Sequence, residues 1–292
     1  MAEGITIQIV AGLTKDASTV NASGRVQHII TEKESKTFGI GDSALKAAIA
    51  KYFGKAPNDA YLHSPTPGND LYKAYNWPQI QTVLVVKSAT ITGITSEPVV
   101  IAKTNLNNKS TKKGTFDAKI SDKVSNSVEN SWSQSDSIDV GQKFKYEVEF
   151  LGSGGGGETS FSYSQEWGIE NKEKKEITVG SSQGVTIELD PGQSVEAQLT
   201  ASRGVMKVRI VYQASLIGST AINYNPPFNG HHFYSLDIVA IMQTSGLPCT
   251  KEITEDIEVG YFANAKVELM DSEGALKKSF SAQDQYGHSL QH

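Results

Sequence analysis

The sequence predicts a mainly β protein with a small α+β part at its N-terminal end. Many segments between residues 142 and 270 alternate apolar and polar side chains, which is the period of a half-buried strand. One convincing helix is expected at residues 42–52, because the composition of DSALKAAIAKY is strongly helical and Gly54 follows it. No repeat at solenoid or propeller spacing appears, and the strands are expected to be mostly antiparallel.

The length, charge and composition of the chain limit its possible size, partners and cross-links. The chain of 292 residues is long enough for two or three modest domains or for one elongated β protein. Its net charge is −5 without a long basic run, so nucleic acid is not an expected partner. Cys249 is the single cysteine, which excludes a disulfide within the chain. No apolar segment approaches the length of a membrane-spanning helix, and no signal peptide is evident.

The N-terminal part, up to about residue 90, is expected to mix helix and strand. Asp42 or Ser43 is the expected N-cap of the helix, since both side chains accept hydrogen bonds from free backbone amides. The other expected elements of this part are a strand at 5–10, a turn-rich and aromatic stretch at 55–79, and a strand at 81–86.

The rest of the chain is expected to form strands, followed by a polar C-terminal segment. Residues 95–140 alternate only weakly and almost lack glycine and proline after 115, which predicts long, twisted strands that are polar on both sides. Asp190-Pro191-Gly192 predicts a tight turn. Further strands are expected at 177–179, 185–189, 195–199, 205–216, 233–242 and 262–270, and residues 271–292 are expected to form a mobile polar tail.

Residues 142–169 form the most informative segment, because they predict an amphipathic β-hairpin around a glycine-rich turn. Aromatic and aliphatic side chains occupy one face of both strands, and lysine, glutamate and serine occupy the other. An antiparallel register that pairs Phe144 with Trp167 and Phe150 with Phe161 keeps the two faces apart, and it places Lys145 opposite Glu166.

Such a hairpin has two possible roles. It can cover a soluble core with its apolar face, or it can join copies from other subunits in a membrane barrel. The apolar band from 144 to 150 spans roughly 23 Å at ~3.3 Å per residue, close to the ~25 Å apolar band of transmembrane β-barrels. On the second reading, Val148→Asp is expected to leave the soluble fold largely intact and to abolish membrane leakage.

The order of these features resembles the aerolysin-like β-pore-forming proteins. Ser/Thr-rich strands at about 104–140, the hairpin at 142–169, the turn in DPGQSVEAQL and the strand at 205–217 are similar to the epsilon-toxin and mosquitocidal-toxin branch. The Tyr- and Trp-bearing N-terminal part is similar to spherulin-like members. The resemblance covers roughly residues 90–245, and it implies an elongated fold of long antiparallel strands with a tucked hairpin that is released after oligomerisation.

The resemblance also implies roles for the hairpin side chains. The turn, Leu151 followed by GSGGGG at 152–157, departs from relatives whose turns are more apolar, and this departure bears on how deeply the turn inserts. Residues expected to face lipid are Phe144, Tyr146, Val148, Phe150, Leu151, Phe161, Tyr163 and Trp167, and those expected to face the lumen are Lys143, Lys145, Glu147, Glu149, Ser162, Ser164 and Glu166.

Two other groups of residues have both a functional and a structural interpretation. Tyr61, Tyr72, Tyr75 and Trp77 are candidates for receptor contact, because amphipathic aromatic side chains bind glycans and protein surfaces well, but a small domain also needs aromatics for its core. Lys277-Lys278 is a candidate activation cleavage site by analogy with the family, or an ordinary solvated pair.

The sequence contains little evidence for an enzyme active site or a metal site. Gly152, Gly154 and Gly157 match G-x-G-x-x-G, but a strand rather than a helix is expected to follow. A metal site at His231-His232 would need further ligands at a defined spacing, and Asp237 is the only obvious one nearby. No catalytic motif stands out, so we expect neither an enzyme nor a cofactor.

The sequence therefore favours a pore-forming toxin-like protein with three parts. Residues 1–90 are expected to bind the receptor, 91–245 to form the pore module, and 246–292 to form a C-terminal β segment and tail. The expected partners are a target-cell membrane, an unknown surface receptor of glycan or protein, and further copies of the chain. We expect a soluble protein, stored in the cell or released, that acts at the plasma membrane of a target cell. The alternative is a non-lytic storage or glycan-binding protein of the same architecture.

Overall fold

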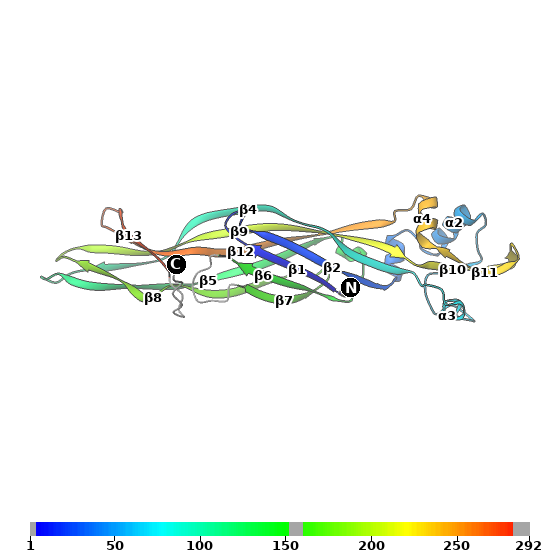
Figure 1. The fold of residues 1–292 in the computed structure, drawn as a ribbon, viewed down its shortest axis with the longest axis horizontal. Helices are drawn as coiled ribbons and strands as arrows, with labels where there is room; N and C mark the ends of the chain where they lie inside the picture. The colour runs from blue at the N-terminus through cyan, green and yellow to red at the C-terminus, as the bar shows by residue number, and fades with distance from the viewer. Residues whose placement is uncertain (1–3, 152–159, 283–292) are drawn as a thin grey trace.

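The structure is a computed structural model that describes residues 4–151 and 160–282, with only the backbone described for Phe161 and residues 181–184. It is an elongated protein of long strands, with a cluster of short helices at one end (Figure 1). We call that end the head and the long sheet that leads away from it the body. The glycine-rich turn of the hairpin lies outside the described residues.

The described part of the body is one sheet of ten strands. All neighbouring strands run antiparallel except β1 and β6, which are parallel. In sheet order the strands are β7 (Ser160–Glu166), β6 (Lys143–Phe150), β1 (Gly4–Ala11), β2 (Thr19–Ile29), β4 (Gln81–Asn107), β9 (Ser194–Ile217), β12 (Thr250–Met270), β5 (Gly114–Ser133) and β8 (Lys172–Leu189), and β13 (Leu276–Ser281) pairs with β12 away from this path.

The head combines segments from both halves of the chain. Its small sheet has the order β11 (His231–Asp237), β10 (Ser219–Phe228) and β3 (Asp59–Tyr61), and its helices are α2 (Asp42–Phe53), α3 (Leu71–Tyr75) and α4 (Ile238–Ser245). Helix α2 packs against α4, and Ser245 Oγ donates to the carbonyl of Ala48 at 3.2 Å. The divisions expected at residues 90 and 245 fall inside β4 and on the last residue of α4.

Long strands form because the alternation continues across segments that look interrupted in the sequence. Strand β9 keeps an inward face of buried residues along nearly its whole length, so the separately expected segments 195–199 and 205–216 are one strand. Strands β4 and β5 are long, as the composition of 95–140 predicts, and residues 95–107 of β4 have no buried side chain. The expectation of strands that are polar on both sides was wrong for β5, because one of its faces is buried along much of its length. The turn at Asp190-Pro191-Gly192 forms as expected, with the amide of Gln193 donating to the carbonyl of Asp190 at 3.0 Å.

Three expectations about secondary structure were wrong. Strand 233–242 ends at Asp237, whose carboxylate accepts a hydrogen bond from the amide of Ala240 at 2.8 Å and thereby caps helix α4. Helix α2 has Gly41 as its N-cap rather than Asp42 or Ser43, although Gly54 ends it in the left-handed conformation as expected.

The polar C-terminal segment is the third. Strand β13 occupies residues 276–281, because it pairs with the free edge of β12 beyond the point where β5 has turned away. Residues 283–292 of the expected tail lie outside the described residues.

A continuous apolar core runs from the head through the middle of the body. It contains the inward residues of β1 and β6, which pack against the inward residues of β9 and β12. Phe144 lies 5.6 Å from Tyr212, and Phe150 lies 6.2 Å from Tyr261, measured between ring centroids. The hairpin of β6 and β7 is therefore a layer of the core that faces β9 and β12 (Figure 1).

One further helix lies beside the point where the chain enters the hairpin. Helix α1 (Glu32–Thr37) starts with a capping box, in which Thr31 and Glu34 bond each other's backbone amides. The buried carboxylate of Glu34 also accepts a bond from the amide of Asp139, at 3.0 Å. Asp139 is four residues before β6, so α1 and the 3-10 turn η1 (Ser135–Ser137) fix the point where the chain enters the hairpin.

Candidate functional site

The hairpin of β6 and β7 separates its two faces completely on β6. Phe144, Tyr146, Val148 and Phe150 are each at most 1% exposed, and they lie in the main core. Lys143, Lys145 and Glu149 point to solvent from the opposite face. On β7, Ser162, Ser164 and Glu166 are exposed, whereas Tyr163 is half-buried and stacks on Tyr146 with ring centroids 4.9 Å apart. The side chain of Phe161 lies outside the described part.

The observed register differs from the expected one by two residues. Phe144 pairs with Gln165, Tyr146 with Tyr163, and Val148 with Phe161. A shift of two keeps each residue on its face, so the two faces stay as predicted while the partners change. Lys143, rather than Lys145, lies opposite Glu166, with a distance of 3.8 Å between Lys143 Nζ and Glu166 Oε1.

Trp167 explains the shift in register, because it does not pair with a residue of β6. Strand β7 ends at Glu166, and Trp167 turns into the core, where its indole nitrogen donates to the carbonyl of Ser135 at 2.8 Å. It packs with Trp132, Phe144 and Tyr212, at centroid distances of 4.6, 5.3 and 5.3 Å. This aromatic cluster is a fixed contact at the open end of the hairpin. Ile169, which the alternation placed beside Trp167, is exposed.

Among the described residues, the hairpin joins the sheet along one boundary. In the described part β7 is a sheet edge, and β6 pairs in parallel with β1 from Thr6–Lys145 to Ala11–Phe150. Gln8 Nε2 donates to Glu147 Oε2 at 2.8 Å on the exposed side of this ladder. Lys145 also bonds Glu147 at 2.6 Å, which together with Gln8 lowers the pKa of this carboxyl. Breaking the β1–β6 ladder is therefore enough to detach the hairpin backbone from the sheet.

Beneath the hairpin lies a buried polar cluster that we did not anticipate. Glu255 of β12 is fully buried, and its carboxylate accepts hydrogen bonds from Tyr146, Tyr212 and Asn130. Burial raises the pKa of Glu255. The sequence did carry a signal for it, because Ile253, Glu255, Ile257 and Val259 alternate with outward residues and put the glutamate on the apolar face.

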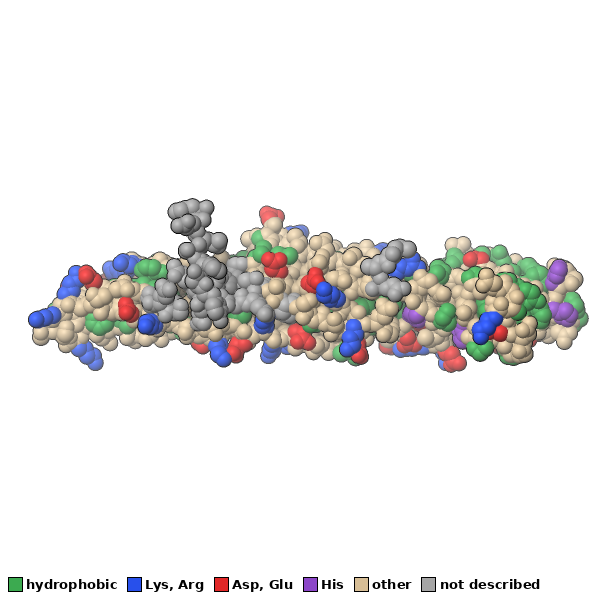
Figure 2. Space-filling model, turned by 60° about the horizontal axis from the view of Figure 1, so that its bottom comes forward, with side chains coloured by type: hydrophobic (Ala, Val, Ile, Leu, Met, Phe, Trp, Pro, Cys, Tyr) green, Lys and Arg blue, Asp and Glu red, His purple; other side chains and the backbone are tan. Residues whose placement is uncertain are grey.

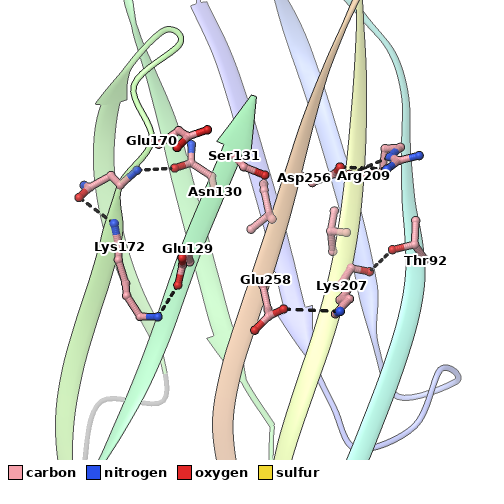
Figure 3. A pocket seen from close by; sticks show the side chains of 13 residues that line it. Thr92, Glu129, Asn130, Ser131, Glu170, Lys172, Lys207, Arg209, Asp256 and Glu258 are labelled. Atoms are coloured by element: carbon pink, nitrogen blue, oxygen red, sulfur yellow. Dashed lines mark hydrogen bonds and ion pairs between the residues drawn. The ribbon is translucent and has the colours of Figure 1, made fainter. Parts of the chain in front are cut away.

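The outer face of the body holds a shallow groove of about 730 Å³ between β4, β9, β12, β5 and β8. Figure 3 shows that most of its charged side chains pair with one another across neighbouring strands, whereas no ion pair is drawn to Glu170. Arg209 donates twice to Asp256, at 2.7 and 2.9 Å, and Lys207 lies 3.7 Å from Glu258. Among the described residues, no group of three or more acidic, histidine or cysteine side chains is arranged to hold a metal ion.

The four aromatic candidates for receptor contact take different positions in the head. Tyr72 is buried, and its hydroxyl donates to the carbonyl of Tyr61 at 2.7 Å and accepts from the amide of Ala221 at 3.1 Å, so it is a core residue. Tyr61 is half-buried in β3. Tyr75 is 50% exposed and stacks on half-buried Trp77, with ring centroids 4.7 Å apart.

A third aromatic ring extends this exposed pair. Phe233 of β11 is 40% exposed and lies 6.3 Å from Tyr75. Figure 2 shows apolar side chains gathered at the head and histidines at its tip. His231 and His232 are the first two residues of β11. His232 Nδ1 is bonded to the carbonyl of Tyr224 at 2.7 Å. The structure thus brings Tyr75 and Trp77 together with Phe233, which we had not singled out.

The candidate cleavage site lies in a strand. Lys277 and Lys278 are exposed residues of β13, and Lys278 pairs with Leu269 of β12. Lys277 Nζ lies 2.9 Å from a carboxylate oxygen of Asp271, and this contact raises the pKa of the lysine. A protease needs an extended, unpaired segment, so cutting here requires β13 to detach from β12 first.

Comparison with known proteins gives both sequence relatives and a structural neighbour. U-megalopygitoxin(8)-Mc8 of Megalopyge crispata is 33% identical over 254 residues, which cover 87% of each chain. U-megalopygitoxin(8)-Mo12 of Megalopyge opercularis is 31% identical over 259 residues, 89% of each chain. No family model matches the sequence.

One structural neighbour is parasporin-2, a Bacillus thuringiensis toxin described as recognising cancer cells. It superposes with a TM-score of 0.65 over 88% of this chain and 99% of its own, at 14% sequence identity. The likeness at this identity concerns the fold, and it confirms the expected mainly β, aerolysin-like architecture. Within the described residues, no helix is both long and apolar enough to cross a lipid bilayer.

Proposed function

The chain belongs to the U-megalopygitoxin(8) family of toxins, and on this premise we propose that it is a pore-forming toxin. It binds the surface of a target cell, oligomerises, and inserts the hairpin of β6 and β7 from each subunit to make a transmembrane β-barrel. The outcome is lysis of the target cell, with a role in defence or in killing insects.

The hairpin is the observation that carries this proposal. Its inner face is apolar and buried in the monomer, its outer face is charged, and one parallel ladder with β1 attaches it to the sheet. A hairpin with these properties can leave as a unit and can present its former core face to lipid. Closing several copies into a ring leaves no unpaired strand edge, which is required of strands in a bilayer.

The same faces give each residue its proposed role in the barrel. The polar face of the hairpin becomes the lumen face, and its apolar face becomes the lipid face, although Leu151 of the apolar set is 37% exposed in the monomer. The lumen is lined by Lys143, Lys145, Glu147, Glu149, Ser162, Ser164 and Glu166, and lipid is contacted by Phe144, Tyr146, Val148, Phe150, Leu151, Phe161 and Tyr163. Trp167 stands outside the ladder in the monomer, so its place at the lipid surface requires β7 to lengthen by one residue.

We propose the same task for each of the three parts of the chain, but the structure changes which residues belong to the part that recognises the target. The head carries target recognition, and it includes residues of β10, β11 and α4 as well as residues before 90. The body carries oligomerisation and insertion. Strand β13 covers the edge of β12 at 266–270, so its removal by cleavage at Lys277-Lys278 uncovers a strand edge that a second subunit can pair with.

Dye release tests the proposal directly. The full chain is added to dye-loaded liposomes and to whole cells, with and without prior trypsin treatment, and oligomers are followed by SDS gel electrophoresis without heating. The expected result is release that accompanies an SDS-resistant oligomer. Absence of release from every target, with the protein still monomeric, would contradict pore formation and favour the non-lytic glycan-binding or storage alternative.

The exposed aromatic group of the head gives a prediction about target recognition. Tyr75→Ala removes the ring that stacks on Trp77 and approaches Phe233. We expect binding to cells to weaken at least about tenfold, since aromatic side chains dominate binding energy at interfaces. The measurement is a titration of fluorescently labelled protein on whole cells.

Tyr52→Ala is the matched control for this variant. Tyr52 is 40% exposed on α2 of the same head. Its removal is expected to leave cell binding unchanged. Equal binding by Tyr75→Ala and the wild type would move the receptor contact away from this aromatic group.

A further inference from the structure

The buried glutamate beneath the hairpin is bound from three directions. Tyr146 of β6 donates to Glu255 Oε1 at 2.7 Å, and Asn130 of β5 donates to the same oxygen at 2.9 Å. Tyr212 of β9 donates to Glu255 Oε2 at 2.6 Å. Only the tyrosine from β6 belongs to the segment that is proposed to leave, so release of the hairpin removes one donor and retains the other two.

The cluster also holds the second strand of the hairpin. Asn130 Oδ1 accepts a hydrogen bond from Gln165 of β7 at 3.0 Å, and another from the amide of Asn171 at 2.9 Å. Gln165 is buried, so this bond is protected from water. The carboxylate of Glu255 is therefore connected directly to β6 by Tyr146, and through Asn130 to β7 and to the chain that follows it.

The ionised form of Glu255 is disfavoured at this place. The titratable groups that interact with it are Tyr146, Tyr163 and Tyr212 from the facing strands and Asp256 on its own strand. None of these supplies a positive charge, and Asp256 points to the outer face, where it pairs with Arg209. Burial raises the pKa of Glu255 above its ordinary value of 4.5, and the bonds from the two tyrosines and Asn130 lower it by less.

We propose that Glu255 is a proton-controlled latch for the hairpin of β6 and β7. With its proton, the uncharged side chain is stable in its dry site, the Oε2 hydroxyl of Glu255 and the hydroxyl of Tyr212 share the contact of 2.6 Å, and the hairpin stays tucked. Without its proton, the buried charge favours the open state, in which water reaches the carboxylate. This inference rests on the proposed function in one respect, namely that the hairpin leaves the sheet during action.

The sign of the pH dependence follows from the direction of the pKa shift. Opening exposes Glu255 to water, where its pKa returns toward its ordinary value. The protonated latch therefore contributes its full stabilisation of the tucked state below pH 4.5, and this contribution is lost as pH rises through the raised pKa. Hairpin opening is expected to increase with rising pH.

A second buried carboxylate acts in the opposite direction and must be separated from the first. Burial raises the pKa of Glu34, but bonds from His28, the Thr31 amide and Thr82 outweigh it, so the pKa is lowered overall. Its contribution, which includes the bond to the Asp139 amide before β6, is lost as pH falls through this lowered pKa. A variant at Glu255 leaves Glu34 unchanged, so the difference between wild type and variant reports the increase in hairpin opening at rising pH that Glu255 causes.

Hydrogen exchange of the full chain in solution, without membranes, measures the latch itself. Protection of the β6 amides is compared between wild type and Glu255→Gln from pH 5 to pH 9, with amides of β9 as the internal reference. Glutamine keeps the size and an acceptor oxygen but does not titrate. We expect wild-type opening relative to the variant to rise up to about tenfold per pH unit within the window between the two pKa values.

Two tyrosine variants form a matched pair. Tyr146→Phe removes the bond that the hairpin makes, whereas Tyr212→Phe removes a bond between two strands that stay in place. Tyr146→Phe is expected to increase exchange of the β6 amides about tenfold relative to β9, and by more than Tyr212→Phe, which breaks no contact of the hairpin.

The outcomes separate this inference from the pore proposal. Identical pH courses for wild type and Glu255→Gln, or equal exchange in the two tyrosine variants, would overturn the latch even if dye is released. The expected exchange pattern supports the latch even if no liposome or cell releases dye, in which case it is the pore proposal that fails.

Discussion

Joining β1 to β6 by a disulfide is expected to abolish dye release. Gln8 and Glu147 are register partners in the parallel ladder, and their side chains bond each other on the exposed face. Neighbouring strands are about 4.8 Å apart, which is within the range that a disulfide bridges. In the Gln8→Cys/Glu147→Cys variant, a linked molecule cannot release its hairpin. Release is therefore expected to fall in proportion to the fraction of molecules that are oxidised, and to return on reduction.

A second cysteine pair controls for the effect of a crosslink as such. Lys207 and Glu258 are register partners on β9 and β12, they are exposed, and they belong to the part of the sheet that stays in place. The Lys207→Cys/Glu258→Cys variant is expected to release dye when oxidised as well as when reduced. The native Cys249 is present in both variants, so its reactions affect them equally. Undiminished release by the oxidised 8–147 variant would show that the hairpin does not leave β1.

Val148→Asp is expected to destabilise the soluble protein severely, and this corrects the expectation from the sequence that the fold would tolerate it. Val148 is 1% exposed in the main core, so the new carboxylate has to take up a proton at neutral pH. That uptake alone costs about 4 kcal/mol, because ~3 pH units at ~1.4 kcal/mol each separate pH 7 from the ordinary pKa of aspartate. Such a loss is comparable to the whole stability of many domains, about 5–15 kcal/mol.

Urea unfolding with Ser164→Asp as the partner variant tests this. Ser164 is exposed on β7 and lies opposite Lys145, so the same aspartate side chain on the outer face of the hairpin meets water and a positive charge. Its effect is expected to stay within about 0.5 kcal/mol. A Val148→Asp protein as stable as Ser164→Asp would mean that β6 does not cover the core. Loss of leakage in Val148→Asp by itself says nothing about the lipid face, since the monomer is already damaged.

Much of the fold was predictable because it depends on local patterns. Alternation identified the strands, the composition of 42–52 identified α2, and the two faces of β6 are those that the sequence indicates. Local patterns failed where a single polar group changes the chain direction. The apolar run at 238–242 suits either a strand or a helix, and the bond from the Asp237 carboxylate to the Ala240 amide selects the helix.

The hairpin register shows a different limit. Alternation with a period of two cannot distinguish registers that differ by two residues, because both keep the same faces together. The choice depends on Trp167, which packs against Trp132 and Tyr212, residues that are more than 30 positions away in the chain. Tyr72 is a comparable case, since only its bonds to Tyr61 and Ala221 identify it as a core residue of the head.

By itself the sequence determined the class of fold, the amphipathic hairpin and the chemical character of its two faces, because these follow from the order of side chains along single strands. Only the tertiary structure decided what holds the hairpin down. The parallel ladder between β1 and β6 and the contact between Tyr146 and Glu255 each join residues more than 100 positions apart. Such pairings depend on how the whole sheet folds back on itself, and no spacing within one segment encodes them.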